Sequence, residues 1–211
     1  MKKYFIGDSC LCWSIGDAIE PELSLQVLAV YRQAKNEILD PAILDYVPSY
    51  NALAIHFDPV LCDLNQLEKK VDGFFEDVFK KDLNDLRVAG EKIIIPVVYD
   101  GEDLTGLSDK HQLSQREIID IHKGGFYSVA MIGFKPHFPY LIGLDKRLET
   151  PRLKTPRLNV PAGAVAIGGS QTGIYPEDSP GGWNIIGMTN PALLKKISPG
   201  DNIEFKEVEK L

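Results

Sequence analysis

The chain is poor in two residue types that build metal centres and disulfide frameworks: it has 3 cysteines and 4 histidines among 211 residues. Cys10, Cys12 and Cys62 cannot all pair with one another, and no Cys-x-x-Cys stretch is present, which excludes a disulfide framework and a ribbon-type zinc site. Cys10 and Cys12 would share one face of an extended strand. A closed zinc site needs about four ligands, however, and His56 is the only obvious further candidate. We therefore expect no metal site in this chain.

Long apolar runs and an excess of positive charge are also missing. No stretch reaches the ~18 consecutive apolar residues of a membrane-spanning helix. Residues 1–6 begin like a signal peptide, but Asp8 interrupts them before an apolar core develops. The formal net charge of -7 disfavours broad binding to nucleic acids or to anionic membranes. Together with the cysteine content, these absences predict a cytoplasmic protein that contacts neither nucleic acid nor membrane.

Three familiar catalytic motifs are incomplete or absent. Residues 168–173 follow an apolar stretch and have the glycine spacing of a phosphate-binding loop, but Ile174 stands where the loop would have its lysine. Ser170 lies in a Gly-x-Ser-x-Thr sequence that lacks the second glycine of a nucleophile elbow. The chain has no His-Glu-x-x-His sequence. Nucleotide or nucleophilic chemistry would therefore need groups supplied by another chain.

The N-terminal part alternates strand-like and helix-like segments. One helix should begin near Pro21, because proline suits a first helical turn, and Asp63 is a candidate N-cap for a second helix. Strands are expected at residues 4–6, 11–15, 43–47, 52–57 and 92–99. The resulting order, ββαββαβ, predicts a two-layer α+β sandwich that resembles a ferredoxin-like unit with an extra edge strand.

The pattern changes near residues 90–105. Beyond this point one helix is expected at residues 114–122, where Ser114 and Glu117 form a capping box. Strand-like segments alternate with turns at residues 127–134, 164–167, 184–189 and 202–208, which is typical of a barrel or a sandwich. We therefore divide the chain into a small α+β domain, residues 1–92, and an all-β domain, residues 93–211.

Residues 133–189 combine many glycines and prolines with aromatic side chains, which indicates a shaped strand-and-loop surface rather than a disordered linker. Four aromatic residues are either ordinary core or the apolar walls of a ligand site: Phe138, Tyr140, Tyr175 and Trp183. The candidate polar contacts are Gln171, Thr172 and Asn184, beside Gly168 and Gly169. Gln171 is expected on a loop, where an amide between glycines has nothing to pack against.

Four basic or titratable residues add further candidates. His122 ends the predicted helix and is either a cation favoured at a helix C-terminus or a catalytic acid–base group. The sequence Thr-Pro-Arg-Leu occurs twice, from residue 150 and from residue 155, and predicts an extended segment fixed by proline. Arg152, Lys154 and Arg157 project from it, either as a solvated surface loop or as a contact for an anion or a partner protein.

A series of motifs in this region resembles one protein family. The motifs are Gly-Phe-Lys-Pro-His-Phe-Pro-Tyr-Leu from residue 133, Thr-Pro-Arg from 150, Val-Pro-Ala-Gly from 160, Ile-Gly-Gly-Ser-Gln-Thr-Gly-Ile-Tyr-Pro from 167 and Ser-Pro-Gly-Gly-Trp-Asn-Ile-Ile-Gly from 179. The chain is similar in them to the B subunit of the bacterial ATP-dependent 5-oxoprolinase, a family also called allophanate hydrolase subunit 1 or Kip-type kinase inhibitor. One position departs: the family usually has glycine where this chain has His137. Histidine adds bulk and reaches positive φ less easily, so the rim of the site should differ.

The resemblance implies a cyclophilin-like barrel and a direct partner, the C subunit, of a related barrel type. Together with the A subunit, the 5-oxoprolinase complex would open 5-oxo-L-proline to L-glutamate at the expense of ATP, and this chain would be active only with those partners. ATP, with Mg²⁺, would be a co-substrate of the complex and would not be held by this chain alone. Two alternatives remain: inhibition of a sensor histidine kinase through the barrel groove, and a carboxyltransferase-like role in an allophanate- or urea-processing enzyme.

Overall fold

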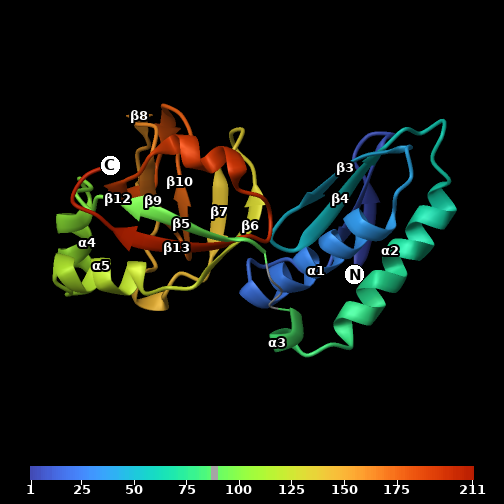
Figure 1. The fold of residues 1–211 in the computed structure, drawn as a ribbon, viewed down its shortest axis with the longest axis horizontal. Helices are drawn as coiled ribbons and strands as arrows, with labels where there is room; N and C mark the ends of the chain where they lie inside the picture. Colours follow the sequence, from blue (N-terminus) through green and yellow to red (C-terminus); the bar gives the residue numbers. More distant parts are fainter. Residues whose placement is uncertain (87–89) are drawn as a thin grey trace. The chain divides into compact units, whose positions relative to one another are not determined.

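The computed structural model describes residues 1–86 and 90–211, and the chain divides into two compact units, Met1–Val88 and Ala89–Leu211 (Figure 1). The first unit contains β1 (Lys2–Phe5), β2 (Cys10–Ser14), α1 (Pro21–Glu37), β3 (Ile43–Pro48), β4 (Ala52–Phe57), α2 (Leu64–Phe79) and α3 (Leu83–Leu86). The second contains β5 (Lys92–Val97), α4 (Leu104–His111), α5 (Gln115–Lys123), β6 (Tyr127–Ile132), β7 (Pro139–Ile142), η1 (Lys146–Leu148), β8 (Arg157–Val160), β9 (Ala164–Gly168), β10 (Gln171–Ile174), β11 (Ser179–Gly181), β12 (Asn184–Met188), η2 (Pro191–Lys196) and β13 (Asn202–Glu207). Each unit encloses its own buried core, which is the usual mark of a structural domain.

The first unit is an antiparallel sheet packed against helices. Its strand order is β1-β2-β4-β3, and Leu11 and Trp13 on β2 join a core that α1 and α2 complete. Pro21 is the first residue of α1, and Asp63 caps α2 by accepting a hydrogen bond from the backbone nitrogen of Gln66 at 3.1 Å. Both helix starts that the sequence predicts are therefore confirmed.

The ferredoxin-like description of this unit is not confirmed. The position beside β2 is taken by β1, the preceding strand of the same hairpin, and no later strand among the described residues joins this sheet. β5, which the sequence order assigned to the sandwich, instead pairs in parallel with β13 of the second unit. A continuous apolar run such as Ile93-Ile94-Ile95 identifies a strand but carries no information about its partner.

The second unit is built on a mixed sheet that closes almost completely into a barrel. Within residues 90–211 its strand order is β12-β9-β10-β7-β6-β13-β5, and β13 with β5 is the parallel pair. The two end strands meet through Val98 and Met188, whose backbone hydrogen bonds measure 2.9 and 2.8 Å. The Thr189 hydroxyl donates to the Pro96 carbonyl oxygen at 2.6 Å at the same junction. The sheet is therefore a nearly closed barrel, as the sequence predicted, and its two end strands are joined at the Val98–Met188 bridge.

The description of this domain as all-β needs correction, because α4 precedes the predicted helix. The capping box of α5 is confirmed: the Ser114 side chain accepts from the Glu117 backbone, and the Glu117 carboxylate accepts from the Ser114 backbone. α4 spans only eight residues and has no side-chain cap, so it gave little sequence signal. The strands β7, β8, β10 and β11 were also missed, because each has three or four residues and contains proline or glycine or lies beside them.

Candidate functional site

The aromatic residues of the glycine- and proline-rich region gather on the outer face of the barrel. Along β9, Val165 and Ile167 belong to the core inside the barrel, whereas Ala164 and Ala166 belong to a second, smaller cluster. Successive side chains of a strand point to opposite faces, so this second cluster lies outside the sheet. Its buried members are Phe138, Val160, Ala164, Ala166, Tyr175, Trp183 and Ile185.

Phe138 is the centre of this cluster. Its ring centroid lies 4.7 Å from that of Tyr140, 5.1 Å from that of Tyr175 and 5.7 Å from that of Trp183, the last two edge-to-face. Phe138, Tyr175 and Trp183 are buried, whereas Tyr140 is half-buried. In this arrangement three of the four predicted wall residues pack against one another, and Tyr140 is the member that reaches the surface.

Two glycines make room for the indole of Trp183. A Cβ atom at Gly168 would lie 2.5 Å from Cδ2 of Trp183, and one at Gly173 would lie 2.9 Å from its Cζ3. Both distances are shorter than van der Waals contact, so any side chain here would displace the ring. Gly169 is different: its φ is +67°, and a Cβ there would meet nothing within 4 Å. The glycine spacing therefore seats a tryptophan, although a phosphate loop has the same spacing.

The prediction that Gln171 lies on a loop is wrong. β9 ends at Gly168 and β10 begins at Gln171, and these two residues pair with each other. The two strands therefore form a tight hairpin, in which Gly169 adopts a left-handed backbone conformation. Paired residues share a face of the sheet, so Gln171 lies on the same face as Gly168 and Trp183. Its side chain is 4% exposed, and the amide nitrogen Nε2 is enclosed without a hydrogen-bond acceptor among the described residues.

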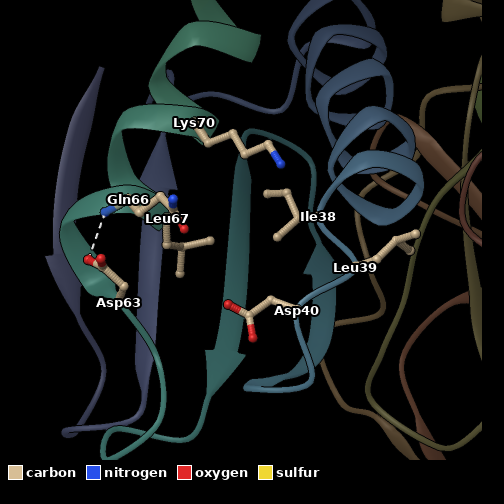
Figure 2. A pocket seen from close by; sticks show the side chains of 7 residues that line it. All are labelled: Ile38, Leu39, Asp40, Asp63, Gln66, Leu67 and Lys70. Carbon is tan, nitrogen blue, oxygen red and sulfur yellow. Dashed lines mark hydrogen bonds between the residues drawn. The ribbon is translucent and has the colours of Figure 1, made fainter.

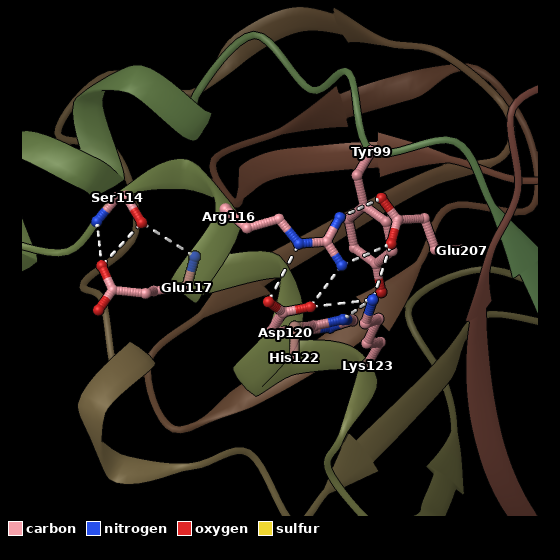
Figure 3. A network of polar contacts seen from close by, with 8 residues as sticks. All are labelled: Tyr99, Ser114, Arg116, Glu117, Asp120, His122, Lys123 and Glu207. Atoms are coloured by element: carbon pink, nitrogen blue, oxygen red, sulfur yellow. Dashed lines mark hydrogen bonds and ion pairs between the residues drawn. The ribbon is translucent and has the colours of Figure 1, made fainter.

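Thr172, by contrast, points into the barrel and away from this face. Its hydroxyl donates to the Ala166 carbonyl oxygen at 3.0 Å and lies 3.0 Å from Nε2 of His122. The single hydroxyl hydrogen is used toward Ala166, so the His122 nitrogen is the donor in the second contact. Nδ1 of His122 then accepts from the Tyr99 hydroxyl at 2.9 Å (Figure 3). The chain of bonds fixes a neutral imidazole with its proton on Nε2.

His122 is completely enclosed, with 0% of its surface exposed. Burial lowers the pKa of its imidazole to about 3, so the ring is neutral at physiological pH and does not act as the helix-terminal cation that the sequence suggested. Its ring lies 4.5 Å from that of Phe205 and 5.4 Å from that of Tyr127, centroid to centroid. In this structure His122 positions β10 through Thr172; a catalytic role for it stays a prediction.

A four-residue charge network of Arg116, Asp120, Lys123 and Glu207 runs along α5 (Figure 3). Glu207 accepts from Arg116 at 2.8 and 2.9 Å and from Lys123 at 2.8 Å, and Arg116 also donates to Asp120 at 3.0 Å. The hydrogen bond from Arg116 is the first cause that lowers the pKa of Asp120, to about 2, and of Glu207. Arg116 and Asp120 are exposed, and Lys123 and Glu207 are half-buried, so the network joins α5 to β13 without acting as a buried reactive centre.

The three candidate cations have different surroundings. Arg157 is committed to the protein: it contacts Glu102 at 2.8 Å and Asp103 at 2.7 Å, and it donates to the Trp183 carbonyl oxygen at 3.3 Å. Lys154 is exposed. Arg152 is exposed as well, with its guanidinium carbon 5.5 Å from the centroid of the Trp183 ring. Arg152 is therefore the member of the set that joins the aromatic cluster with its charge available.

A contact between Thr150 and His111, which sequence reasoning missed, holds this region in place. The Thr150 backbone pairs with that of Gly169 through bonds of 3.1 and 2.7 Å, and the Thr150 hydroxyl lies 2.7 Å from Nε2 of His111 on α4. The Asn184 amide donates to the carbonyl oxygens of Pro151 and Ile167, both at 3.1 Å, so this predicted ligand contact is already used. The His111 contact joins residues 39 positions apart, and no local sequence signal could have revealed it.

The first unit carries a separate pocket of ≈ 220 Å³ between the end of α1 and the start of α2 (Figure 2). It is lined by Ile38, Leu39, Asp40, Asp63, Gln66, Leu67 and Lys70. Three of its polar residues have partners: Asp63 caps α2, Asp40 accepts from the Ala42 backbone nitrogen at 2.9 Å, and the Lys70 ammonium donates to the Glu37 carbonyl oxygen at 3.0 Å. The charged groups of this pocket are therefore already engaged with backbone atoms of the protein.

None of the described helices is long and apolar enough to cross a membrane. No group of three or more His, Cys, Asp or Glu side chains in the described ranges could hold a metal ion, and this includes the row of Cys10, Cys12 and His56.

Comparison with known proteins places this architecture in a family. Residues 1–198 match the family described as carboxyltransferase domain, subdomain C and D, and the chain belongs to it. Within it, the chain belongs with the B subunits of 5-oxoprolinase: it is 37% identical to that protein of Haemophilus influenzae, over 95% of this chain and 94% of the relative. The Bacillus subtilis protein of the same name is 34% identical, with 96% and 91% covered. The chain also has the same fold as part of TTHA0988, whose crystal structure matches it with a TM-score of 0.81 and 32% identity. The match covers 96% of this chain and 40% of the TTHA0988 chain.

Proposed function

We propose that this chain is the B subunit of an ATP-dependent 5-oxoprolinase that opens 5-oxo-L-proline to L-glutamate. The observation that supports it most is the match, over nearly the full length of both chains, to relatives named as B subunits of 5-oxoprolinase. Those relatives are named as subunits, which supports the proposal that this chain works in a complex of several proteins. In this proposal the C subunit is the direct partner of the barrel and the A subunit is the third component. In this proposal the protein is cytoplasmic and its barrel is of the cyclophilin-like type.

The proposed reaction breaks the lactam bond between the ring carbonyl carbon and the ring nitrogen. One water supplies the new carboxylate oxygen and the proton for the released amine, and a second is consumed as ATP becomes ADP and phosphate. A lactam amide is stable, so transfer of the terminal phosphoryl group of ATP to the ring carbonyl oxygen would activate the carbonyl carbon. Addition of the first water and departure of the ring nitrogen would leave an acyl phosphate, from which the second water would release phosphate. The glycine-rich turn at Gly168 holds Trp183 in place of a nucleotide. We therefore place Mg²⁺-ATP at groups completed by the partner proteins.

The test is reconstitution. The purified chain is combined with the A and C subunits, and release of glutamate from 5-oxo-L-proline is measured with and without ATP. We expect release that requires ATP and all three proteins. A correctly assembled complex that releases no glutamate would remove the proposal. Lys195→Gln changes an exposed cation outside the aromatic cluster and should leave the rate unchanged.

The kinase-inhibitor alternative predicts a different result. A chain that grips a sensor histidine kinase would slow its autophosphorylation without the A and C subunits. Measuring autophosphorylation across a titration of the chain separates the two functions, since a component of 5-oxoprolinase should leave the rate unchanged.

A further inference from the structure

The fold does not explain why the amide nitrogen of Gln171 is buried without a hydrogen-bond acceptor. Enclosing an amide donor without an acceptor is unfavourable, and most buried polar groups avoid that cost by pairing. Nε2 of Gln171 is enclosed with no acceptor, although glutamine could be replaced here by leucine or methionine of similar size. A polar side chain kept at such a position is expected to serve something that the free chain lacks.

Arg152, which lies against the ring of Trp183, is a second group without a charged partner. No carboxylate of the described residues is within ion-pair distance of Arg152, whereas Arg157 five positions later contacts two. The chain has 30 Asp and Glu residues, so acidic partners are not scarce. Arg152 also lies close enough to Tyr140 for its charge to oppose the rise that burial produces in the Tyr140 pKa. The stacked guanidinium thus keeps its donors free for an external anion.

The two groups and Trp183 make up a recognition surface with defined chemistry. Gln171 offers its unpaired NH2 group from β10, Arg152 offers a charged, forked donor from the segment before β8, and Tyr140 with Trp183 offers aromatic area. A ligand that satisfies all three has a carbonyl oxygen, a carboxylate and a compact ring. Phosphate fits less well, because a neutral amide and two aromatic rings add little to its binding.

We propose that Gln171 and Arg152 form a subsite for a small cyclic carboxylate that bears a ring carbonyl, with Nε2 of Gln171 donating to the carbonyl oxygen and Arg152 pairing with the carboxylate. The assignment rests on the proposed function, because 5-oxo-L-proline is a ligand of this class. Nε2 is enclosed, so a side chain must move to admit the ligand. Arg152 is exposed and lies against the Trp183 ring, and in this proposal its side chain is the one that shifts.

Three probes separate the two contacts. 5-Oxo-L-proline has both the ring carbonyl and the carboxylate, 2-pyrrolidone has the carbonyl alone, and cyclopentanecarboxylate has the carboxylate alone. Their dissociation constants are measured by calorimetry for the reconstituted complex without ATP, and for the free chain. We expect the complete ligand to bind at least 10-fold more tightly than either fragment.

Two substitutions should respond in opposite patterns. Gln171→Leu should weaken 5-oxo-L-proline and 2-pyrrolidone about 10-fold and leave cyclopentanecarboxylate unchanged, because only the carbonyl loses its donor. Arg152→Gln should weaken the two carboxylates about 10-fold and leave 2-pyrrolidone unchanged. Gln171→Met provides a second variant of similar volume should leucine disturb the barrel. Gln115→Leu and Lys195→Gln are the matched controls at exposed positions and should bind all three probes normally.

The results distinguish failure of the subsite from failure of the proposed function. If the wild-type complex releases glutamate but Gln171→Leu and Arg152→Gln keep the wild-type KM and Kd, the subsite is wrong and the function stands. If a folded wild-type complex binds none of the probes and releases no glutamate, both are wrong. Equal weakening of all three probes by either variant would indicate a structural role and would also overturn the assignment.

Discussion

His137 lies in the left-handed backbone region, which is strained for a residue other than glycine. It has φ of +67° in the turn between β6 and β7, where the related family usually has glycine. A non-glycine residue in this conformation costs about 1–2 kcal/mol, although glycine returns part of this by loosening the unfolded chain. We expect His137→Gly to raise the free energy of unfolding by about 0.5–1 kcal/mol, measured by urea denaturation with an unchanged m-value. A lower midpoint would contradict the strain.

Phe134 in the same turn provides the comparison. Its φ is +65°, but its ring also contacts Phe138 edge-to-face at 5.5 Å. Phe134→Gly relieves strain and loses this contact, so its gain in stability should be smaller than that of His137→Gly. The sequence had indicated that histidine reaches positive φ with difficulty; the structure adds that the residue nevertheless adopts it.

His122 makes the stability depend on pH. Burial holds its folded-state pKa near 3, below the ordinary unfolded value of about 6.5, so the unfolded chain binds the extra proton first. The contribution of the neutral ring is complete above pH 6.5 and is lost as the pH falls toward 3. Between pH 7 and pH 5 we expect the free energy of unfolding to drop by about 1–2 kcal/mol. His122→Gln should be less stable at pH 7 and should show a flatter profile; an equal slope would assign the effect to other groups.

Gly168 connects the residue scale to the hairpin of β9 and β10. An added Cβ would lie 2.5 Å from the Trp183 ring, so Gly168→Ala should cost about 1–3 kcal/mol and shift the Trp183 ring. Chemical denaturation and near-ultraviolet circular dichroism measure the two effects. Gly106→Ala in α4 meets nothing within 4 Å and should stabilise by up to about 1 kcal/mol. Similar values for the two variants would mean that Gly168 does not seat the indole.

The elements that the sequence predicted well are those whose signal is local. Helix starts at Pro21, Asp63 and Ser114 depend on residues within one turn, and all three occur. The short strands of the barrel depend instead on partners far along the chain, as β5 does on β13. The wrong placement of Gln171 on a loop has the same cause. The neighbouring glycines indicated a turn, but Gly168 and Gly173 are required because they contact Trp183, which lies further along the chain. The sequence identified the members of the aromatic cluster, but it could not show which of them are buried in the core and which reach the surface of a ligand site.

At the scale of the whole molecule, the two units contain separate cores. The first is built around residues such as Phe75, and the second around residues such as Ile174, both with 0% exposure. Local stability should therefore differ between them, and damage to one core should be confined to its own unit.

Hydrogen exchange can test this independence. Phe75→Ala removes a fully buried ring and should cost the first unit about 3–5 kcal/mol, so amides of residues 1–86 should exchange faster. Amides of β9 and β10 should keep their protection, and binding of 5-oxo-L-proline by the chain should persist. Ile174→Ala should give the reverse pattern and abolish binding, because β10 carries Gln171. Faster exchange of β10 in Phe75→Ala would mean that the two cores unfold as one, and the candidate site would then depend on the first unit for its order.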